Sequence, residues 1–400
     1  MKVYITEMDS RYGTEPVLAE GNKKMFVIPA DFKFDKEKNE ERVKGLYEML
    51  CSDLPQDKWI TVSVPEMLLN DLMLKDEKMF KKLYDSGKAK GRNGFINSAG
   101  SVEYEGSSTY LKMHSPIKQP LKPTGLCNVL GGQFANRMGY TDFISTEGSS
   151  CASGMKSIFE AEMLIKTGYL DRVLIMASED QISYVSVEMF GMLGASLSKK
   201  EEDNGIKTSA FDEKNLGFRL GNGVGFFLIE SEKSIKETGN KPKMEILSTA
   251  FCGEEATSPI MVRMDGKGYY ESMKIALMRG KINPEQIDLV KTHGTGTILN
   301  NMSEGNAIRA LFKNNPKIKA TSYKPMIGHT FGPAALIEAH ITYKEALKGN
   351  VIGIKNKETS DGIFINEDLE MKPEIVMFNA AGMGNVFGTM IARILYDWYK

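Results

Sequence analysis

The chain contains several short apolar runs and one clearly amphipathic segment. The strand-like runs occur in both halves, at residues 172–177, 225–229, 287–290, 375–378 and 388–392. Met155, Ile158, Phe159 and Ile165 recur at the spacing of one helix face, and Gly168 is placed to cap the C-terminus of that helix. The pattern therefore predicts strands in both halves and a helix whose N-terminus falls at residue 151.

The remaining pattern gives the outline of the chain. Residues 35–95 are rich in Lys, Glu and Asp and show helix-like spacing, so we expect a peripheral helical excursion there. No proline-, serine- or glycine-rich linker divides the 400 residues. The sequence therefore predicts one compact unit, with a possible boundary in the charged stretch 232–243.

Cys151 lies in the short polar segment 147–154, which brings it into the first turn of the predicted helix. Free backbone N–H groups and the positive end of the helix dipole favour thiolate over thiol at such a position, and they can donate to an acyl oxygen. The placement predicts a nucleophile with a lowered pKa. A lone buried cysteine is more often inert packing, so this interpretation depends on partner residues.

Two of the four histidines, His293 and His329, stand in glycine-rich turns that follow strand-like runs. Turns at strand ends are where α/β proteins place their chemistry. Either histidine alone could simply cap its turn, and for His114 and His340 a structural role is favoured. Because the two turns have the same form, His293 and His329 are the candidate functional histidines.

One cysteine followed by two loop histidines resembles the β-ketoacyl-acyl carrier protein synthases, the condensing enzymes of the thiolase superfamily. Residues 150–154 resemble the nucleophile turn of that family, residues 293–297 its first histidine motif, and Lys324 with His329 its lysine and second histidine motif. Residues 211–223 and 379–384 resemble two further segments, the second being the C-terminal glycine loop. The resemblance covers roughly residues 115–395, and the first hundred residues match poorly.

The resemblance implies an α/β fold of the thiolase type. We expect two similar halves, each a mixed five-stranded sheet with helices, stacked as αβαβα layers. Residues 1–235 would form the N-terminal half, which carries the nucleophilic cysteine, and residues 236–400 the C-terminal half, which carries both histidine motifs. The active site would lie between the halves.

The resemblance also implies catalytic roles. Cys151 would take an acyl group from a carrier thioester, with its own backbone amide and that of Met383 as the oxyanion hole. His293 and His329 would donate N–H groups to the enolate that forms when a malonyl thioester loses carbon dioxide. The enolate carbon would then attack the acylated Cys151.

Two hydroxyls and two charges complete the implied site. Thr295 and Thr297 would hydrogen-bond the phosphopantetheine arm of the substrate, although a core or turn role is an equal alternative. Lys324 would support catalysis near His329, and Glu304 would lie behind the histidines, a charged pair that orients them and fixes their protonation. Outside such motifs, a lysine and a glutamate are usually only solvated.

Several positions depart from the family pattern. Asn222 stands where the family commonly has glutamate, Asn215 where it has arginine, and Asn301 where it has aspartate. If these groups form an ion-pair network in relatives, replacing several together can be nearly neutral. Met383 and Ala381 replace aromatic residues at the gate, which predicts a wider substrate-binding passage and hints at an unusual acyl chain. The alternative is drift with compensating repacking.

The composition of the chain argues against several classes of protein. With 51 basic and 52 acidic residues, the net charge is -1, so neither a nucleic-acid nor a membrane surface is expected. No apolar stretch is long enough to span a bilayer, and the N-terminus resembles neither a signal nor a transit peptide. The four cysteines show no metal-binding spacing. We expect a cytoplasmic protein with no metal and no bound cofactor.

The expected partner is acyl carrier protein, which carries substrates on phosphopantetheine, and relatives suggest a homodimer or a heterodimer with a related ketosynthase-like subunit. Three functions remain open. The first is decarboxylative condensation in fatty-acid or polyketide biosynthesis. The second is transfer of the acyl group to an amine or alcohol without elongation, and the third is a non-catalytic chain-length partner, which Cys151 argues against. Thiolase chemistry is disfavoured because residues 379–388 contain no second cysteine.

Overall fold

The computed structural model describes residues 1–12, 15–19, 23–27, 77–100, 132, 135, 136, 138–179, 189–221, 223–255, 258, 260–359 and 361–396. One large sheet contains β1 (Val3–Tyr12), β4 (Asn93–Ser98), β5 (Phe143–Glu147), β6 (Arg172–Glu179), β7 (Gly223–Ser231), β8 (Met244–Gly253), β9 (Leu289–Lys291), β10 (Lys319–Thr321), β13 (Ile375–Gly382) and β14 (Val386–Ile394). Two small ladders pair β2 (Glu15–Ala19) with β3 (Lys23–Val27) and β11 (Asn350–Val351) with β12 (Leu369–Glu370).

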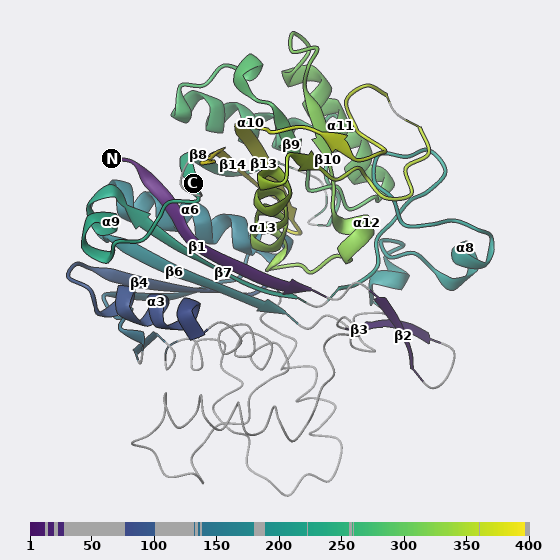
Figure 1. Cartoon of the computed structure of the whole chain (residues 1–400). Coiled ribbons are helices and arrows are strands. Elements are labelled where there is room, and N and C mark those ends of the chain that lie inside the picture. Colours follow the sequence, from purple (N-terminus) through teal and green to yellow (C-terminus); the bar gives the residue numbers. More distant parts are fainter. Residues whose placement is uncertain are drawn as a thin grey trace, which may run out of the picture.

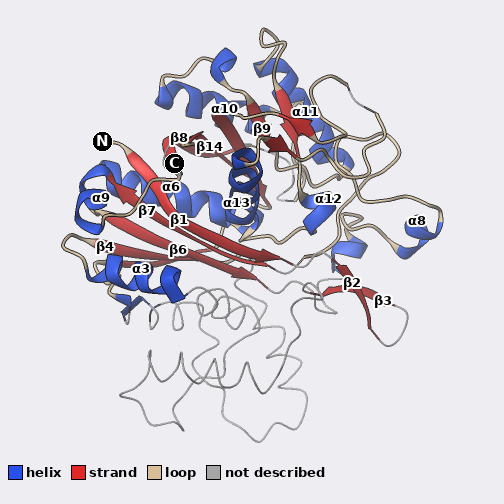
Figure 2. Cartoon of the chain, viewed as in Figure 1, coloured by secondary structure: helices blue, strands red, loops and turns tan. Residues whose placement is uncertain are grey.

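Helices alternate with these strands along the chain (Figure 2). The labelled helices are α3 (Glu77–Lys88), α6 (Ser153–Lys166), α8 (Lys199–Asp203), α9 (Glu232–Thr238), α10 (Lys267–Gly280), α11 (Ile298–Leu311), α12 (Lys324–Ile327) and α13 (Ala334–Leu347). Two short 3-10 turns are η3 (Ser150–Ala152) and η4 (Pro284–Gln286).

The large sheet is built of two halves with the same arrangement. The N-terminal half has the order β5-β4-β6-β7-β1 and the C-terminal half the order β10-β9-β13-β14-β8. In each half, three strands run parallel and the next two are antiparallel. The halves meet where β1 pairs with β8, with Val3 opposite Ile246 and Ile5 opposite Met244. The prediction of two similar mixed halves of five strands is confirmed.

Two of the described helices lie between the halves. α6 contacts β4, β6 and β7 of one half and β8, β13 and β14 of the other, and α13 contacts β1 and β7 as well as β9 and β13. Outside this central layer, α10 packs on β8 and β14 beside α11, and α9 contacts β7 (Figure 1). The five layers therefore follow the expected order of helix, sheet, helix, sheet, helix.

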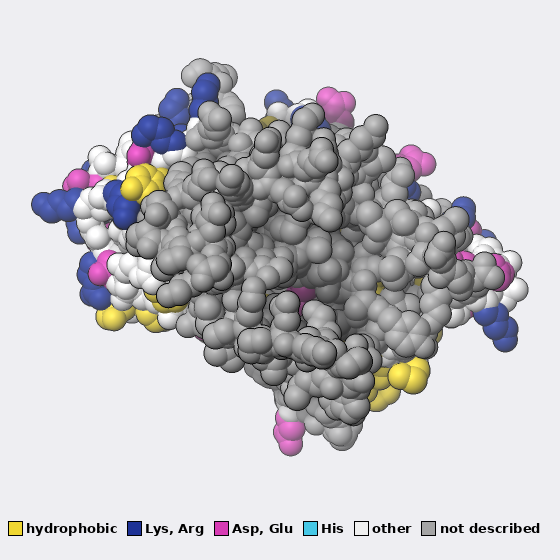
Figure 3. All heavy atoms as spheres, turned by 90° about the horizontal axis from the view of Figure 1, so that it is seen from below, with side chains coloured by type: hydrophobic (Ala, Val, Ile, Leu, Met, Phe, Trp, Pro, Cys, Tyr) yellow, Lys and Arg dark blue, Asp and Glu magenta, His cyan; other side chains and the backbone are white. Residues whose placement is uncertain are grey.

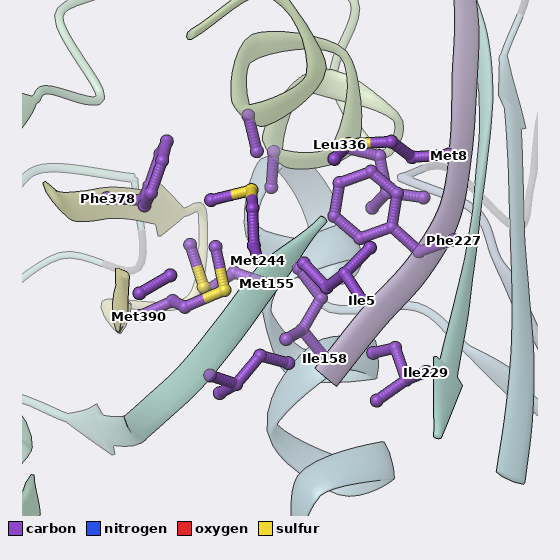
Figure 4. Close-up of a cluster of buried hydrophobic side chains, with 14 of the residues drawn as sticks. Ile5, Met8, Met155, Ile158, Phe227, Ile229, Met244, Leu336, Phe378 and Met390 are labelled. Atoms are coloured by element: carbon purple, nitrogen blue, oxygen red, sulfur yellow. The ribbon is translucent and has the colours of Figure 1, made fainter. Parts of the chain in front are cut away.

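The central layer buries the largest apolar cluster (Figure 4). Met155 and Ile158 of α6 meet Ile5 of β1, Phe227 of β7 and Met390 of β14 in this cluster, and all five are 0% exposed. Full burial of such side chains contributes about 1.5–3 kcal/mol each relative to an exposed position. Apolar residues at helical spacing on α6 thus fix the helix that follows Cys151.

Strands β6, β7, β13 and β14 bury both of their faces. On β6, Val173 and Ile175 point into the central cluster, whereas Leu174 and Met176 point outward and pack with Leu83 of α3. Successive side chains of a strand point to opposite faces, so a strand covered on both sides is apolar at every position. This explains why the strands appear in the sequence as continuous apolar runs.

Most predicted elements are present. Four of the predicted runs lie within β6, β7, β13 and β14, whereas β9 begins two residues later than expected because η4 leads the chain into the sheet. Helix α6 ends at Lys166, and Gly168 has φ +75°, as expected for its cap.

The helical excursion predicted for residues 35–95 is corrected at its end. Residues 77–88 form α3, but β4 begins at Asn93 and pairs with β5 and β6 inside the sheet. Its sequence, Asn-Gly-Phe-Ile-Asn-Ser, is too polar to stand out as a strand. Residues 35–76 lie outside the described ranges.

Candidate functional site

Cys151 lies where β5 leads into α6. It belongs to η3, a single 3-10 turn, rather than to the first turn of the α-helix as predicted. Ser150 adopts φ +52°, a left-handed conformation that is uncommon for a residue with a side chain. The thiol is 7% exposed, and its Sγ lies 3.7 Å from Ser150 Oγ. The turn therefore holds the Cys151 thiol in a buried position.

The predicted lowering of the Cys151 pKa is wrong for this structure. Burial raises the pKa of the thiol to about 12, because a thiolate loses its hydration there, and the Glu179 carboxylate adds repulsion. The Ser150 hydroxyl and the Lys324 ammonium act in the opposite direction but do not offset burial. Cys151 is therefore a neutral thiol before substrate binds.

Apolar rings surround the thiol. Cys151 shares a buried cluster with Phe190, Phe218, Leu220 and Phe331. The Phe190 and Phe331 ring centroids lie 5.0 Å apart, and those of Phe190 and Phe218 lie 6.0 Å apart. These aromatic residues exclude water from the thiol. Phe218 lies in the segment 211–223 that resembles the family, whereas Phe190 and Phe331 belong to none of the motifs identified in the sequence.

His293 follows β9 in the turn that leads to α11. Gly294 and Gly296 have φ +50° and +81°, and a Cβ atom at Gly296 would lie 2.0 Å from the carbonyl oxygen of Ser209. Only glycine fits such a position. The Glu304 carboxylate accepts the backbone N–H groups of His293 at 2.8 Å and Gly294 at 2.9 Å. Glu304 of α11 therefore fixes the backbone of the His293 turn.

His329 follows α12 through Gly328, which has φ +76°. Its Nδ1 accepts the backbone N–H of Phe331 at 3.3 Å, so the ring proton lies on Nε2. The ring centroids of His293 and His329 are 5.7 Å apart. Phe218 and Phe331, which neighbour Cys151, also contact the His329 ring, at centroid distances of 5.0 and 4.2 Å. The cysteine and both histidines therefore belong to one buried site.

Both imidazoles are neutral at physiological pH. Burial holds the pKa of His293 well below its usual value, and the positive charge of Lys324, the neighbouring His329 and the positive charge of Lys291 lower it further. Burial and the same two lysines lower the pKa of His329. Each ring can then donate one N–H to a developing negative charge without itself carrying a charge.

Lys324 and Glu304 are both buried near the histidines, but they do not pair with each other. Lys324 Nζ donates to the carbonyl oxygen of His293 at 2.6 Å and forms an ion pair with Glu338 Oε1 at 2.7 Å. Glu304 instead holds the peptide of His293. Its pKa is raised by burial, although the N–H groups of Gly294 and His293 oppose that shift. The expected charged pair is thus corrected to Lys324 with Glu338.

The sequence interpretation missed Glu338 and Lys291. Lys291 also forms an ion pair with Glu338, through Oε2, and both side chains are 1% exposed. A signal was present in each case. Glu338 interrupts the apolar face of the helix that follows His329, and Lys291 ends a strand of otherwise apolar residues. A charge inside a buried element needs a partner, and here the two are partners.

Thr295 and Thr297 lie in the His293 turn, where their hydroxyls are 3.2 Å apart. Thr295 is buried, and Thr297 is the N-cap residue of α11 without a side-chain capping bond. Both positions suit either a structural or a ligand-binding role.

Two of the asparagines that depart from the family pattern form hydrogen bonds with nearby backbone groups. Asn215 Oδ1 accepts the backbone N–H of Lys207 at 3.0 Å, and its Nδ2 donates to the Asn356 carbonyl at 2.9 Å. Asn301 Nδ2 donates to the Gly296 carbonyl at 3.3 Å. These two amides bind backbone groups. Asn222 and His114 lie outside the described residues.

The turn between β13 and β14 reaches the thiol. A Cβ atom at Gly382 would lie 2.5 Å from the Ser149 carbonyl oxygen and 3.2 Å from the Ala152 amide nitrogen, so the two turns are in close contact. Met383, next along the chain, is 37% exposed. This places the Met383 turn beside the first residues of η3, where the oxyanion hole was predicted.

Within the described ranges, no group of three or more His, Cys, Asp or Glu side chains could hold a metal ion. None of the helices found there is long and apolar enough to cross a bilayer. On the face seen from below, the described charged side chains at the edge are of both signs (Figure 3).

Sequence comparison links the chain to one family in both halves. The N-terminal domain of the β-ketoacyl synthase family matches residues 74–234, and its C-terminal domain matches residues 244–353. The two matches are consecutive and together span about two thirds of the chain.

Curated relatives agree. A 3-oxoacyl-[acyl-carrier-protein] synthase 2 from Rhizobium meliloti is 28% identical over 68% of this chain and 65% of its own length. The corresponding protein of Vibrio cholerae is 27% identical over 68% of this chain and 67% of its own, and a putative mitochondrial synthase from Schizosaccharomyces pombe is 30% identical over 59% and 56%. The chain thus matches between about half and two thirds of these relatives.

Solved structures show the same fold. A type II polyketide synthase ketosynthase in complex with its acyl-carrier protein aligns with a TM-score of 0.74 at 18% identity, covering 98% of this chain and 99% of its own. A β-ketoacyl synthase from Burkholderia phymatum aligns with a TM-score of 0.73 at 19% identity over 98% and 99%. The two-halved, five-layered architecture is therefore the thiolase-like fold that was expected, and with both family domains matched in order, this chain belongs to the β-ketoacyl synthase family.

Proposed function

We propose that this protein is a β-ketoacyl synthase that condenses an acyl group on Cys151 with a malonyl group on acyl carrier protein. The observation that carries the proposal is the pair of buried, neutral imidazoles, whose ring centroids lie 5.7 Å apart beside a buried thiol. Decarboxylation of a malonyl thioester develops negative charge on the thioester oxygen. Two uncharged N–H donors in a water-poor site stabilise such a charge strongly.

In the first step, Cys151 Sγ attacks the carbonyl carbon of an acyl thioester on the carrier. The new carbon–sulfur bond replaces the one to the phosphopantetheine sulfur, and the thiol proton of Cys151 ends on that departing sulfur. The backbone N–H groups of Cys151 and Met383 are proposed to hold the tetrahedral oxyanion. The close contact of Gly382 with the Ser149 and Ala152 backbone supports this arrangement.

In the second step, a malonyl thioester takes the place of the released carrier. Its carbon–carbon bond to the carboxylate breaks, carbon dioxide leaves, and the electron pair remains as an enolate that the Nε2–H of His329 and the N–H of His293 stabilise. The enolate carbon attacks the acyl carbonyl carbon and expels Cys151 as a thiolate, which takes up one proton. The product is a β-ketoacyl thioester two carbons longer.

The remaining assignments are proposals on the same basis. Thr295 and Thr297 bind the phosphopantetheine arm, Met383 borders the acyl passage, and Lys324 and Glu304 hold the His293 turn. We also propose a division into a half of residues 1–235 and a half of residues 236–400, which the positions of the strands of each half support.

The biological setting is also proposed. Acyl carrier protein is the partner, because one structural neighbour is a ketosynthase bound to such a carrier and the curated relatives are named for it. The protein would elongate fatty acids or polyketides in the cytoplasm, as a homodimer or as a heterodimer with a related subunit. The type II polyketide synthase neighbour supports the polyketide setting. No bound cofactor is needed for either step.

The test is the intact mass of malonyl-loaded carrier protein after incubation with the enzyme and a panel of acyl carriers. A product two carbons longer, absent with Cys151→Ala and with His293→Ala, supports the proposal. An acylated Cys151 that leaves the malonyl carrier unchanged with every acyl donor contradicts it, and favours transfer to an amine or alcohol instead.

A further inference from the structure

The backbone of His293 is hydrogen-bonded by a buried charged side chain at its N–H and by another at its carbonyl oxygen. Its N–H donates to Glu304 Oε1 at 2.8 Å, and its carbonyl oxygen accepts Lys324 Nζ at 2.6 Å. Glu304 is 0% exposed and Lys324 1% exposed. The orientation of the imidazole is therefore determined by groups on two helices, α11 and α12.

Glu304 and Lys324 are also connected to each other by a second chain of polar contacts. Lys324 binds Glu338 on α13, Glu338 binds Lys291 on β9, and Lys291 Nζ donates to the Asn379 carbonyl oxygen at 3.3 Å. The circuit closes at Glu304, whose Oε1 accepts Asn379 Nδ2 at 3.2 Å. His293, Glu304, Asn379, Lys291, Glu338 and Lys324 thus form a closed ring of hydrogen bonds and ion pairs.

Lys291 is the member of this ring that stability alone does not explain. Glu338 is already paired with Lys324 at 2.7 Å, so one positive charge balances it. A second buried ammonium adds a desolvation cost that the shared carboxylate repays only in part. Consistent with this, burial lowers the pKa of Lys291 even though Glu338 opposes the shift. A buried charge kept at a net cost near a catalytic site calls for a functional reason.

We propose that Lys291 is a positioning residue for the decarboxylative step: it closes the ring that fixes the His293 peptide, and it keeps a second positive charge behind both imidazoles. This inference rests on the proposed condensation. Lys291 touches neither substrate nor thiol in this scheme and acts through Glu338, Asn379 and the field that it exerts on the histidines.

Among the described residues, the buried ionisable groups around the imidazoles are Cys151 of η3, Glu179 of β6, Glu304 of α11, Lys324 of α12, Glu338 of α13 and Lys291 itself. Lys291 is named among the charges that lower the pKa of both His293 and His329. Removing it lets each imidazole bind a proton at higher pH, which replaces a neutral donor by a cation.

The experiment separates the two steps of the reaction. Acyl transfer is measured as acylation of Cys151 by intact mass, and decarboxylation as loss of carbon dioxide from malonyl carrier protein on the acylated enzyme, each from pH 5 to 8. Lys291→Met should slow decarboxylation about tenfold to a hundredfold, as expected when a supporting residue is lost. Acylation should stay within about threefold of the parent, because Cys151 is held by a different turn.

The acid limb of the decarboxylation profile is the readout that a merely structural role would not move. In Lys291→Met it should shift to higher pH, because the neutral imidazole is lost sooner as the pH falls. Lys291→Gln keeps a donor for the Asn379 carbonyl and is the variant to use if the methionine protein does not fold. It should show the same shift of the acid limb with a smaller loss of rate.

The chain supplies a matched control. Glu7 is also a buried carboxylate shared by two lysines, Lys82 and Lys243, each 2.7 Å away, and Lys243 is only 15% exposed. Lys243→Met removes one lysine from the arrangement around Glu7 and should leave both rates and the acid limb unchanged. A wild-type enzyme that never decarboxylates malonyl carrier would refute the proposed condensation. Equal slowing of both steps by Lys291→Met, or an unmoved acid limb, overturns the role of Lys291 alone.

Discussion

The phenyl ring of Phe331 lies face to face on the imidazole of His329, with centroids 4.2 Å apart and planes 7° from parallel. Phe331 has φ +53°, so its backbone conformation is unfavourable for a residue with a side chain. Its N–H also donates to His329 Nδ1. The same residue therefore fixes the tautomer of the imidazole through its backbone and the plane of the ring through its side chain.

Phe331→Leu should separate these two functions. The backbone bond to His329 Nδ1 and the positive φ remain, but the stacked face is lost, and such aromatic pairs contribute about 0.5–1.5 kcal/mol. We expect condensation to slow about two- to tenfold, measured as the rate of formation of the elongated carrier. Phe190→Leu, which changes an aromatic that packs on Phe331 rather than on the imidazole, is the comparison. An equal loss in both variants would assign the effect to the apolar environment of the thiol.

Gly382→Ala should disrupt the contact between the Met383 turn and η3. The new Cβ would lie 2.5 Å from the Ser149 carbonyl oxygen, a distance at which the backbone must move. If the two turns together form the oxyanion hole, acylation of Cys151 should fall about a hundredfold or more, as for loss of one donor. The measurement is the rate at which Cys151 gains the mass of the acyl group.

Gly253→Ala is the control for that substitution. Gly253 lies at the end of β8, and its new Cβ would meet only the Asn385 carbonyl oxygen at 3.6 Å, an ordinary contact. Acylation should be unchanged. A Gly382→Ala protein that acylates at the rate of Gly253→Ala would show that the Met383 turn does not take part in the oxyanion hole.

The buried histidines should make the protein sensitive to mild acid. The pKa of His293 is held well below its ordinary value of 6.5, so below pH 6.5 the unfolded chain binds a proton that the folded chain does not. Stability must then fall as the pH drops from 6.5 towards the folded pKa, by up to about 1.4 kcal/mol per pH unit for each such group. Above pH 6.5 this contribution is fully present.

His293→Asn isolates that contribution from other groups that titrate in the same range. Urea unfolding of the parent and the variant at pH 7.0, 6.0 and 5.0 should give a shallower loss of unfolding free energy for the variant. Parallel curves for the two proteins would mean that His293 binds its proton in the folded state, and would remove the basis for a neutral donor.

Much of the fold could be predicted because β6, β7, β13 and β14 are apolar on both faces and appear as uninterrupted runs. β1 and β4 could not, because each carries polar residues that find specific partners only in three dimensions. Glu7 in β1 is 1% exposed yet pairs with lysines from α3 and from the segment before β8. Pairing between residues far apart in the chain leaves no periodic signal.

Some residues of the candidate site could likewise be predicted from the sequence, and others could not. Cys151, His293 and His329 stand in glycine-rich turns and could be located from the sequence. The partner of Lys324 was misassigned, because Glu304 and Glu338 both lie on helices that follow a histidine turn, and only the packing decides which faces Lys324. The Cys151 pKa was mispredicted because the helix terminus was considered without the burial that outweighs it.

Glu338→Gln should destabilise the protein strongly. It leaves Lys291 and Lys324, each 1% exposed, without a carboxylate, and breaking a buried ion pair from one side costs about 3–5 kcal/mol. Glu7→Gln is the matched change. It should cost less, because Lys82 is 50% exposed and can turn to solvent. Urea unfolding at pH 7 measures both, and a smaller loss for Glu338→Gln would mean that one of the two site lysines is already neutral.

The reactivity of the thiol should follow its burial. A rise in the Cys151 pKa from 9.0 to about 12 leaves about a thousandfold less thiolate at neutral pH than in an exposed cysteine. Carbamidomethylation of Cys151 by iodoacetamide should therefore be slow at pH 7 and should increase about tenfold per pH unit up to pH 10 without a plateau. Half-buried Cys252, whose pKa is also raised, provides an internal comparison in the same peptide digest. A plateau for Cys151 near pH 8 would show that its pKa lies below the ordinary value of 9.0, and would contradict the effect of burial.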